Sequence, residues 1–374
     1  MRTFDHRPCS GVRVIPPAHH SPELILARKP APKGPSRGPV VTPKRPPVKS
    51  RAKGRPAAKT TSSPTRSAAP PMWCKPSPIV LVSDATVDDA LLTIATACRN
   101  HWQANLAAAL VGEHPEGIHQ VRVGLRRFRV FLTLFSDYLP SDQLTWLKTE
   151  AKALGDALGP ARDLDVFLAE LMEPLSDKGA HDANVAILMR TARNARNDAH
   201  AAAVVALTSK RYSRFMTRLN TWLTGRGWRR GDVRARRRSA ESFARAVLNR
   251  RLAKIASNTK SIENMRAAKL HRLRIAVKKL RYGFEFFHAA LPQKRTTRAS
   301  LLLKGLQDSL GYVNDLDVAK RMLTMLSEHA ADDQTRLAII RGGRRLTATF
   351  DAAAKAARPQ AVRIATRLRA QKPL

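Results

Sequence analysis

Apolar residues recur at helical spacing from about residue 85 to the end of the chain. The first such segment covers residues 85–112, and the side chains of Ser83 and Asp84 just before it are suited to cap a helix. Gly112 marks the end of the segment, because glycine commonly terminates helices. This pattern predicts an all-α protein.

Three more helical segments follow before the pattern breaks. The second covers about residues 117–138, and its apolar face is formed by Leu125, Phe128, Leu132 and Phe135. Pro140 ends it, and Ser141 is placed to cap a third helix. The apolar positions of that third helix are Leu144, Leu147, Leu154 and Leu158. A fourth long helix is expected over about residues 181–223.

The helical part of the chain repeats itself at a constant offset of 152 residues. The segment LGDALGPARDLDV (154–166) aligns without a gap with LQDSLGYVNDLDV (306–318). The same offset relates Phe135, Leu139 and Pro140 to Phe287, Leu291 and Pro292. Matches at one offset through several blocks indicate a duplicated supersecondary unit.

The repeat predicts the domain organisation. Residues 225–238 are rich in glycine and arginine and break the periodicity, so they are interpreted as a hinge between two copies. The first copy covers about residues 83–224 and the second about residues 239–374. Helices of the second copy are expected to end near residues 257, 290 and 327 and at the end of the chain. We therefore expect two tandem, pseudo-symmetric four-helix bundles within residues 81–374.

Residues 1–80 have a different composition. They contain 17 of the 24 prolines and 16 lysines and arginines, but only two acidic residues, Asp5 and Glu23. A segment with so much proline and so few apolar residues cannot offset the entropy of ordering. We expect a disordered basic tail here. The chain carries a net charge of +38, and the tail accounts for +14 of it, so the helical part is itself strongly basic.

A stripe of basic residues occurs twice in the helical part. The first stripe and its equivalents 152 residues later are His119, Arg122, Arg126 and Arg129, and His271, Arg274, Lys278 and Arg281. Steps of three, seven and ten residues fall within roughly 80° of arc on a helix, so each stripe forms one continuous face. A charged stripe is most often a solvated surface, but its retention in both copies favours a role in binding an anion, since guanidinium groups grip phosphate oxygens bidentately.

Acidic residues of the repeat provide an alternative explanation. Two carboxylates lie on one face of the third helix of each copy and could form ion pairs with stripe arginines: Asp156 and Asp163 in the first, and Asp308 and Asp315 in the second. The sequence leaves open how many stripe arginines such pairs neutralise.

The segments HQVRVGLRRFR and LHRLRIAVKKLRY, each followed by an LGxxxxDLD-type block, resemble the two signature segments of the CHAD domain, the conserved histidine α-helical domain. The resemblance covers about residues 83–374. It implies two pseudo-symmetric four-helix bundles that bind inorganic polyphosphate in a basic central channel. The residues that it implies as ligands are the eight stripe residues, with Arg127 and Lys279 in supporting positions. Copy two departs from copy one in having Lys278 and Lys279 where copy one has Arg126 and Arg127.

Two other functions are considered. The tail contains Lys53-Gly54-Arg55-Pro56, which is similar to the core of an AT-hook, so nucleic acid binding through Lys53 and Arg55 is the main alternative. A metal-dependent phosphohydrolase could be imagined with metal ligands from the two stripe histidines and from the pairs Asp163/Asp165 and Asp315/Asp317. It is disfavoured, because residues i and i+2 on a helix point apart, the histidines lack HxxxH spacing and the surrounding arginines repel divalent cations. We therefore expect a binding protein without catalytic residues, metal or cofactor.

The chain has no run of eighteen apolar residues, and its N-terminus has no apolar core of the signal-peptide type. The sequence thus favours a cytoplasmic protein, associated with polyphosphate granules if the resemblance extends to function. It says nothing about oligomeric state.

Overall fold

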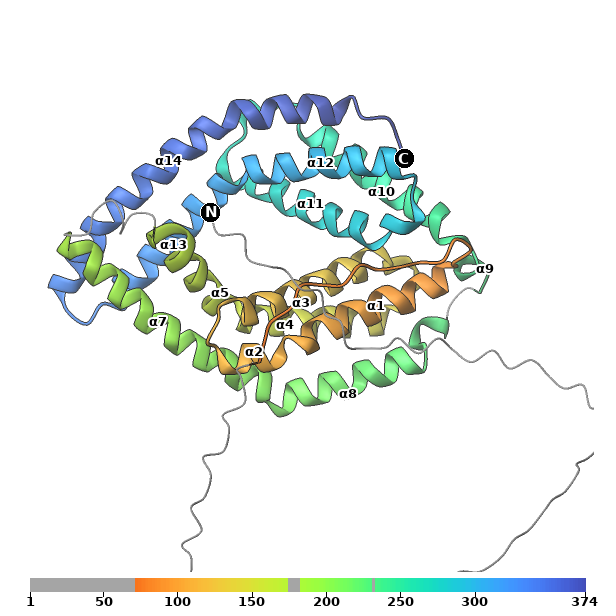
Figure 1. The fold of residues 1–374 in the computed structure, drawn as a ribbon, viewed down its shortest axis with the longest axis horizontal. Helices are drawn as coiled ribbons and strands as arrows, with labels where there is room; N and C mark the ends of the chain where they lie inside the picture. Colours follow the sequence, from red (N-terminus) through yellow and green to blue (C-terminus); the bar gives the residue numbers. More distant parts are fainter. Residues whose placement is uncertain (1–70, 174–181, 231–232) are drawn as a thin grey trace, which may run out of the picture. The chain divides into compact units, whose positions relative to one another are not determined.

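The computed structural model describes residues 71–173, 182–230 and 233–374, and every regular element within these ranges is a helix (Figure 1). The predicted all-α class is confirmed. Most of the expected tail, including Lys53 and Arg55, lies outside the described residues. No helix in the described ranges is long and apolar enough to cross a membrane.

The first repeat begins with a helix capped by its own side chains. Thr86 accepts a hydrogen bond from the backbone of Asp89, and the Asp89 carboxylate accepts one from the backbone of Thr86, so the helix begins at Val87 rather than directly after Ser83 and Asp84. The elements of this repeat are α1 (Val87–Ala104), α2 (Leu106–Val111), α3 (Glu116–Leu134), η1 (Ser136–Tyr138), α4 (Ser141–Ala157), α5 (Gly159–Val166), η2 (Phe167–Met172), α7 (Ala183–Thr208) and α8 (Lys210–Thr224).

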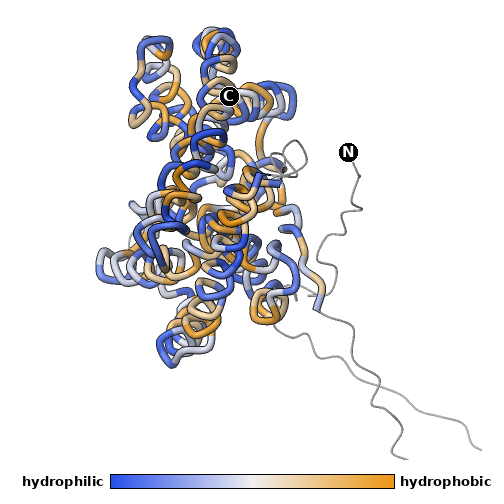
Figure 2. Tube along the Cα trace, turned by 90° about the vertical axis from the view of Figure 1, so that its left-hand side faces the viewer, coloured by the Kyte–Doolittle hydropathy of each residue, from blue (hydrophilic) through white to orange (hydrophobic). Residues whose placement is uncertain are grey.

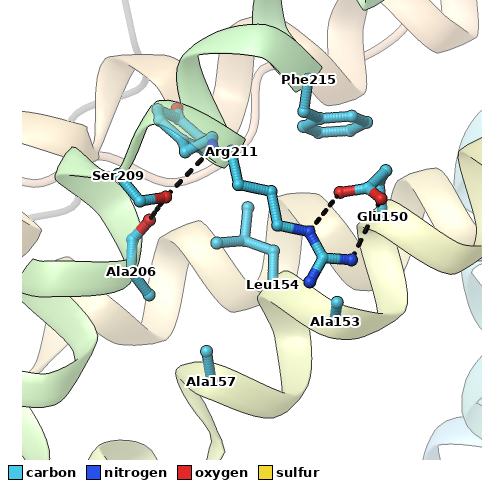
Figure 3. A pocket seen from close by; sticks show the side chains of 9 residues that line it. Glu150, Ala153, Leu154, Ala157, Ala206, Ser209, Arg211 and Phe215 are labelled. Atoms are coloured by element: carbon cyan, nitrogen blue, oxygen red, sulfur yellow. Dashed lines mark hydrogen bonds and ion pairs between the residues drawn. The ribbon is translucent and has the colours of Figure 1, made fainter.

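Two of the expected single helices are broken in the structure. The segment 85–112 divides at Asn105, whose buried side chain donates hydrogen bonds to the carbonyls of His101 and Cys74, and α2 ends at Gly112 with φ of 73°. The segment 181–223 divides at Ser209, which has extended backbone geometry and caps α8 by accepting a hydrogen bond from Tyr212. Figure 3 shows this junction beside Arg211, which donates two hydrogen bonds to Glu150 at 2.8 and 3.0 Å.

The second repeat follows the first with little change in register. Its elements are α10 (Ala240–Asn258), η4 (Ile262–Asn264), α11 (Ala267–Phe286), η5 (His288–Ala290), α12 (Gln293–Ser309), α13 (Gly311–Glu328) and α14 (Asp333–Arg369). The bounds of η5 and α12 equal those of η1 and α4 plus 152. The main difference is α14, which corresponds to α7 and α8 together. Ala361 stands at the position of Ser209 and cannot cap a new helix, so this helix continues.

The helices form the two four-helix bundles that the repeat predicts. In the first bundle α1, α3, α4 and α8 pack together, and in the second α10, α11, α12 and α14 do so (Figure 1). Figure 2 shows that the helices carry both hydrophobic and hydrophilic residues, as amphipathic helices do. Close packing of α1 on α3 requires Gly124, because a Cβ atom there would lie 2.8 Å from that of Trp102.

The two bundles share one hydrophobic core. The rings of Phe135 and Phe287, which occupy equivalent positions in the repeats, lie 6.0 Å apart, and Phe243 packs against both. The starts of α1 and α10 are joined by a short antiparallel bridge, in which Val87 donates to the carbonyl of Arg238 and Ala240 donates to that of Ala85. The repeats are therefore halves of one packed body.

A second hydrophobic cluster also combines both repeats. It contains Phe167 and Leu171 of η2 and Leu188 of α7, together with Val318 of α13 and Ile339 of α14. The α7 helix packs along α14, so the long helices that end each repeat are paired with each other. This pairing holds α5 and α13 beside the stripe helices.

The expected hinge is anchored to the first bundle. It contains η3 (Gly227–Arg230) and α9 (Val233–Arg236), and Trp228 is fully buried. The Asp88 carboxylate accepts hydrogen bonds from the Trp228 indole and the Arg229 guanidinium, both at 2.6 Å, and forms an ion pair with Arg226. The segment is thus a packed corner where it is described.

The ordered body begins before the expected boundary at residue 81. Ile79 and Leu81 are buried, and the backbone of Cys74 donates a hydrogen bond to the Asn105 side chain at 2.8 Å. Apolar contacts that the composition of residues 1–80 obscures therefore extend the body back to about residue 71.

Candidate functional site

The two cationic stripes lie on equivalent helices that meet between the bundles. The first stripe is on α3 and the second is on α11, and these helices pack against each other (Figure 1). The four apolar residues expected to line the other face of α3 are each no more than 1% exposed. Burial of this apolar face fixes the rotation of α3, which turns most of the stripe toward the second bundle.

His119 lies near the middle of a group of cations drawn from both repeats. Burial and the positive charges of Arg162, Lys278, Arg126 and Arg122 lower its pKa to about 3. Lys278 belongs to α11 and Arg162 to α5, so three elements converge on this imidazole. In the absence of a ligand, His119 is therefore neutral at physiological pH and can donate or accept one hydrogen bond at each ring nitrogen.

Lys278, the second-stripe equivalent of Arg126, belongs to the same group of cations. Burial lowers its pKa from 10.5 to about 7, with further contributions from the charges of Arg126, Arg274, Arg162 and Arg281. The four charges that contribute most are all positive and disfavour the ammonium form. An anion that enters the group stabilises that form.

Arg122 and Arg274 are held by hydrogen bonds to neutral acceptors. Arg122 donates to the carbonyl of Gly155 on α4, and Arg274 donates to the side chain of Asn314 on α13 at 2.9 Å. The Nε atoms of both are buried and have no hydrogen-bond partner among the described residues. Burial lowers the pKa of Arg122 to about 10 and also lowers that of Arg274. These guanidinium groups are positioned but not neutralised.

The four acidic residues of the repeat that could pair with the stripes have other partners in the described structure. Asp156 pairs with Lys152 at 2.6 Å and Asp308 with Lys304 at 3.6 Å, each one helical turn away. Asp163 lies 3.9 Å from Arg321 of α13, and the Asp315 carboxylate accepts a hydrogen bond of 3.5 Å from Asn314. Within the described ranges, no ion pair joins these acids to a stripe cation. Asp163 and Asp315 still act on Arg122 and Arg274 at longer range.

The remaining expected ligands lie in different surroundings. Arg129 and Lys279 are exposed. The pKa of Lys279 is lowered by partial burial and by the charge of Arg129, so these two residues from different repeats lie near each other. Arg281 is half-buried and lies near Lys278. His271 is half-buried, and its Nδ1 atom has no hydrogen-bond partner in the part of the chain that the structure describes.

Arg127 is placed differently from what its position beside Arg126 suggests. It is 3% exposed, and its guanidinium carbon lies 5.5 Å from the centre of the Phe286 ring. Its charge also contributes to lowering the pKa of buried His101. Residues i and i+1 point in directions about 100° apart on a helix, so Arg127 enters the protein interior while Arg126 joins the stripe. This placement argues against the expected supporting contact between Arg127 and a polyanion.

Arg162 and Arg251 also act on expected ligands, although no sequence pattern singled them out. Arg162 has no basic equivalent in the second copy, where Asn314 stands at its position, yet its charge acts on both His119 and Lys278. Arg99 and Arg251 are 152 residues apart and both have a buried Nε atom without a hydrogen-bond partner in the described structure. Arg251 also lies near Lys279. The constant offset could have found the Arg99 and Arg251 pair, but not Arg162.

A cleft of about 490 Å³ opens beside the first stripe. Arg122 lines it together with the α4–α5 junction, Ala195 and Ala199 of α7 and Met322 and Met325 of α13. Asp156 and Asp163 also line this cleft, so its polar groups have mixed charge. No group of three or more His, Cys, Asp or Glu side chains within the described ranges is arranged to hold a metal ion.

Comparisons with known proteins agree with the sequence resemblance. The family profile of the CHAD domain matches residues 93–324. The crystal structure of the CHAD domain from the plant Ricinus communis is similar to this chain with a TM-score of 0.70 and 31% identity. That match covers 81% of this chain and 98% of the plant domain.

A second solved structure, PptA from Streptomyces chartreusis, has a TM-score of 0.53 and 16% identity. It covers 75% of this chain and 99% of that protein, and at this identity the likeness concerns the fold alone. A search of curated protein sequences found no significant match.

Proposed function

This chain belongs to the CHAD family, and from that premise we propose that it binds inorganic polyphosphate between the stripes of α3 and α11. One observation carries the proposal: His119, Arg122, Arg126, Arg274 and Lys278 converge from both repeats, and no ion pair within the described ranges neutralises them. A cluster of like charges lowers the stability of the free protein, and an anion with many closely spaced charges relieves that repulsion.

The proposed ligands are the residues that the structure brings together or leaves accessible. They are His119, Arg122, Arg126, Arg129, His271, Arg274, Lys278, Lys279 and Arg281, with Arg162 added and Arg127 assigned to packing. Arg129 and Lys279 add exposed basic residues to the buried group. A single phosphate would leave most of these cations without a partner. We propose binding without catalysis, in the cytoplasm and at polyphosphate granules.

Nucleic acid is the competing polyanion, because the helical part carries +24 of net charge outside the first 80 residues. Titration of the full chain with long-chain polyphosphate and with duplex DNA, at matched phosphate concentration and about 0.15 M salt, separates the two classes. We expect tighter binding of polyphosphate. Equal affinity for DNA would argue against a site built for polyphosphate.

A double variant tests the location of the site. Arg122→Glu combined with Arg274→Glu should weaken polyphosphate binding by about tenfold or more, because each guanidinium forms charge-assisted hydrogen bonds with phosphate. The matched control is Arg190→Glu combined with Arg298→Glu, which changes the net charge equally at exposed positions of α7 and α12. Equal losses in both double variants would mean that only net charge matters and that the stripes are not the site.

A further inference from the structure

The packed corner at η3 carries a second basic region, separate from the stripes. A hollow of about 620 Å³ opens there, and residues of α4, α8 and η3 line it. Its walls include two tryptophans and three arginines, and no stripe residue: Trp146, Trp222, Arg218, Arg226 and Arg229. Cavities of this size commonly hold small organic ligands, so the chemistry of the walls indicates the class of ligand.

The Trp146 ring provides a flat surface for stacking. The guanidinium carbon of Arg218 lies 4.1 Å from the centre of this ring. Trp146 is half-buried and packs on Phe215 with the ring centres 5.8 Å apart, whereas Arg218 is exposed. An exposed guanidinium can move and stack on the outer face of an inserted ring, because it is planar. Nucleic acid bases stack on tryptophan in the same way.

Gln143 provides hydrogen-bond donors beside this ring. Gln143 and Trp146 are three residues apart on α4, so they lie on one face of that helix. The Gln143 side-chain oxygen accepts a hydrogen bond of 2.8 Å from the Trp222 indole, which sets the orientation of the amide group. The amide N–H groups have no hydrogen-bond partner within the described ranges, and Gln143 lines the hollow. Bases carry ring nitrogens and carbonyl oxygens that accept from such donors.

The turn that carries Arg226 and Arg229 is held firmly in place. A Cβ atom at Gly227 would overlap the Trp222 ring, so this backbone lies directly against the tryptophan. Arg226 has φ of 45°, which is unfavourable for a residue with a side chain, and its ion pair with Asp88 helps to hold it there. The two arginines are therefore positioned before any ligand arrives.

A second hollow of about 420 Å³ adjoins the first, because Arg226 and Arg229 line both. Arg236 and Arg237 also line the second hollow, and neither forms an ion pair within the described ranges. Arg236 is only 7% exposed, and its guanidinium donates to the carbonyl of Trp228 at 2.9 Å. A buried cation whose hydrogen-bond partner is neutral is stabilised by an anion that enters the hollow.

Acidic residues do not cancel the charge of this corner. Five arginines and three aspartates line the two hollows, which leaves a net charge of +2. Asp88 is engaged by Arg226 and Arg229, and Asp89 is engaged in the cap of α1. Asp142 lies in the first turn of α4, where the helix dipole favours a carboxylate. The corner thus combines a stacking surface with an adjoining anion site.

We propose that this corner binds a nucleoside diphosphate. The base stacks on Trp146 and accepts a hydrogen bond from Gln143 in the first hollow. The ribose passes Arg229, and the phosphates bind Arg236 and Arg237 in the second hollow, since guanidinium groups grip phosphate oxygens bidentately. The site shares no residue with the stripes, so the proposal goes beyond the proposed function and does not depend on it.

The walls fit one base rather than a run of stacked bases. Trp222 is 7% exposed, so of the two tryptophans that line the first hollow only Trp146 offers an accessible face. Grooves for single strands present aromatic rings to successive bases. A free nucleotide is therefore favoured over a nucleic acid chain.

The test is calorimetric titration of the full chain with ADP and with pyrophosphate at about 0.15 M salt. We expect ADP to bind at least about tenfold more tightly than pyrophosphate, because stacking of the base adds to the binding of the phosphates. We also expect ADP to quench tryptophan fluorescence. Equal affinity for ADP and pyrophosphate overturns the proposal, because the base would then contribute nothing.

Variants of the stacking surface locate the site. Trp146→Leu should weaken ADP binding by about tenfold, whereas Trp146→Phe keeps an aromatic face and should retain most of the affinity. Arg218→Gln changes the same surface without touching the core and should also weaken binding. Its matched control is Arg214→Gln, which is exposed on α8, lines neither hollow and should have no effect. Unchanged ADP affinity in both Trp146→Leu and Arg218→Gln overturns the proposal.

Two further titrations separate this site from binding of other polyanions. The Arg122→Glu and Arg274→Glu double variant should bind ADP as the unaltered protein does, and loss of ADP binding there would overturn the corner site in favour of the stripes. A single-stranded oligonucleotide should displace ADP no better than free nucleotide at matched concentration, and better displacement would overturn the choice of a free nucleotide. Failure of the proposed function appears instead as weak polyphosphate binding, which the ADP titrations do not measure.

Discussion

At the scale of single residues, the site combines groups that keep their charge with groups that lose it. Arg122 and Arg274 remain cationic at all physiological pH values, whereas His119 and a fraction of Lys278 are neutral in the free protein. A histidine with an ordinary pKa of about 6.5 would place the pH dependence of binding between about pH 6 and 8. With the pKa of His119 at about 3, Lys278 becomes the group that changes charge near neutrality.

The pH dependence of binding follows from Lys278. Its pKa is about 7 in the free protein, and a polyanion favours the ammonium form, so binding above pH 7 requires proton uptake. Polyphosphate affinity should fall by up to about tenfold per pH unit as pH rises from 7 to 9. Calorimetric titration at several pH values measures this slope. Lys278→Arg should flatten it and Lys254→Arg should not. An unchanged slope in Lys278→Arg would contradict the assignment.

Arg126 and Arg127 are neighbours in sequence but should respond differently to truncation. Arg127→Ala removes a buried side chain that packs on Phe286 and should lower the free energy of unfolding by about 2 kcal/mol. Polyphosphate affinity of the folded variant should change little. Arg126→Ala should show the reverse, with weakened binding and smaller loss of stability. Urea unfolding and titration of both variants make the comparison, and equal loss of affinity would return Arg127 to the binding site.

At the scale of helices, the repeats differ most at their ends. The first repeat divides its last helical segment into α7 and α8 at Ser209, whereas the second has the continuous helix α14. The division lets α8 return along α1 and α4 while α7 pairs with α14. Ser209 caps α8 in the first copy, whereas Ala361 at the equivalent position of the second copy has no side-chain acceptor for a cap.

Removal of the cap should therefore have a measurable cost. Ser209→Ala deletes the acceptor for the Tyr212 backbone and should lower the free energy of unfolding by about 1 kcal/mol. Ser213→Ala, on the exposed face of α8, is the matched control and should change stability by less than about 0.5 kcal/mol. Chemical unfolding of both variants gives the two values. Equal stability of Ser209→Ala and the unaltered protein would show that packing alone sets the break.

At the scale of the whole molecule, the arrangement of the bundles concentrates charge. The shared core around Phe135 and Phe287 and the pairing of α7 with α14 bring α3, α5 and α11 together, and each contributes cations to one region. Hydrophobic packing thus opposes electrostatic repulsion between the halves. A polyanion that binds the folded body should strengthen the whole fold, because binding to the native state shifts the unfolding equilibrium.

Thermal unfolding provides the test at this scale. Long-chain polyphosphate at about one hundred times its Kd should stabilise the protein by about 2.7 kcal/mol, and the rise in Tm should shrink as salt is added. The Arg122→Glu and Arg274→Glu double variant should lose most of this rise, and the Arg190→Glu and Arg298→Glu control should keep it. Equal stabilisation of both double variants by polyphosphate would indicate binding spread over the basic surface.

The sequence alone determined the all-α class, the repeat and the equivalence of the two stripes, because helical period and constant offset are properties of the chain read in one dimension. It also identified the buried apolar face of α3. The sequence did not predict the helix break at Ser209, because its apolar pattern fits one long helix as well as two. It also did not distinguish Arg126 from Arg127, because the two side chains have the same chemistry.

Only the tertiary structure decided what each stripe faces. The approach of Arg162 to His119 and the altered pKa of Lys278 depend on contacts between helices far apart in the chain. Burial and the nearness of other charges set the proton affinity of a side chain, and neither can be read from spacing along one helix. The sequence therefore identified the stripe residues, and the packing of the two repeats determined their charge.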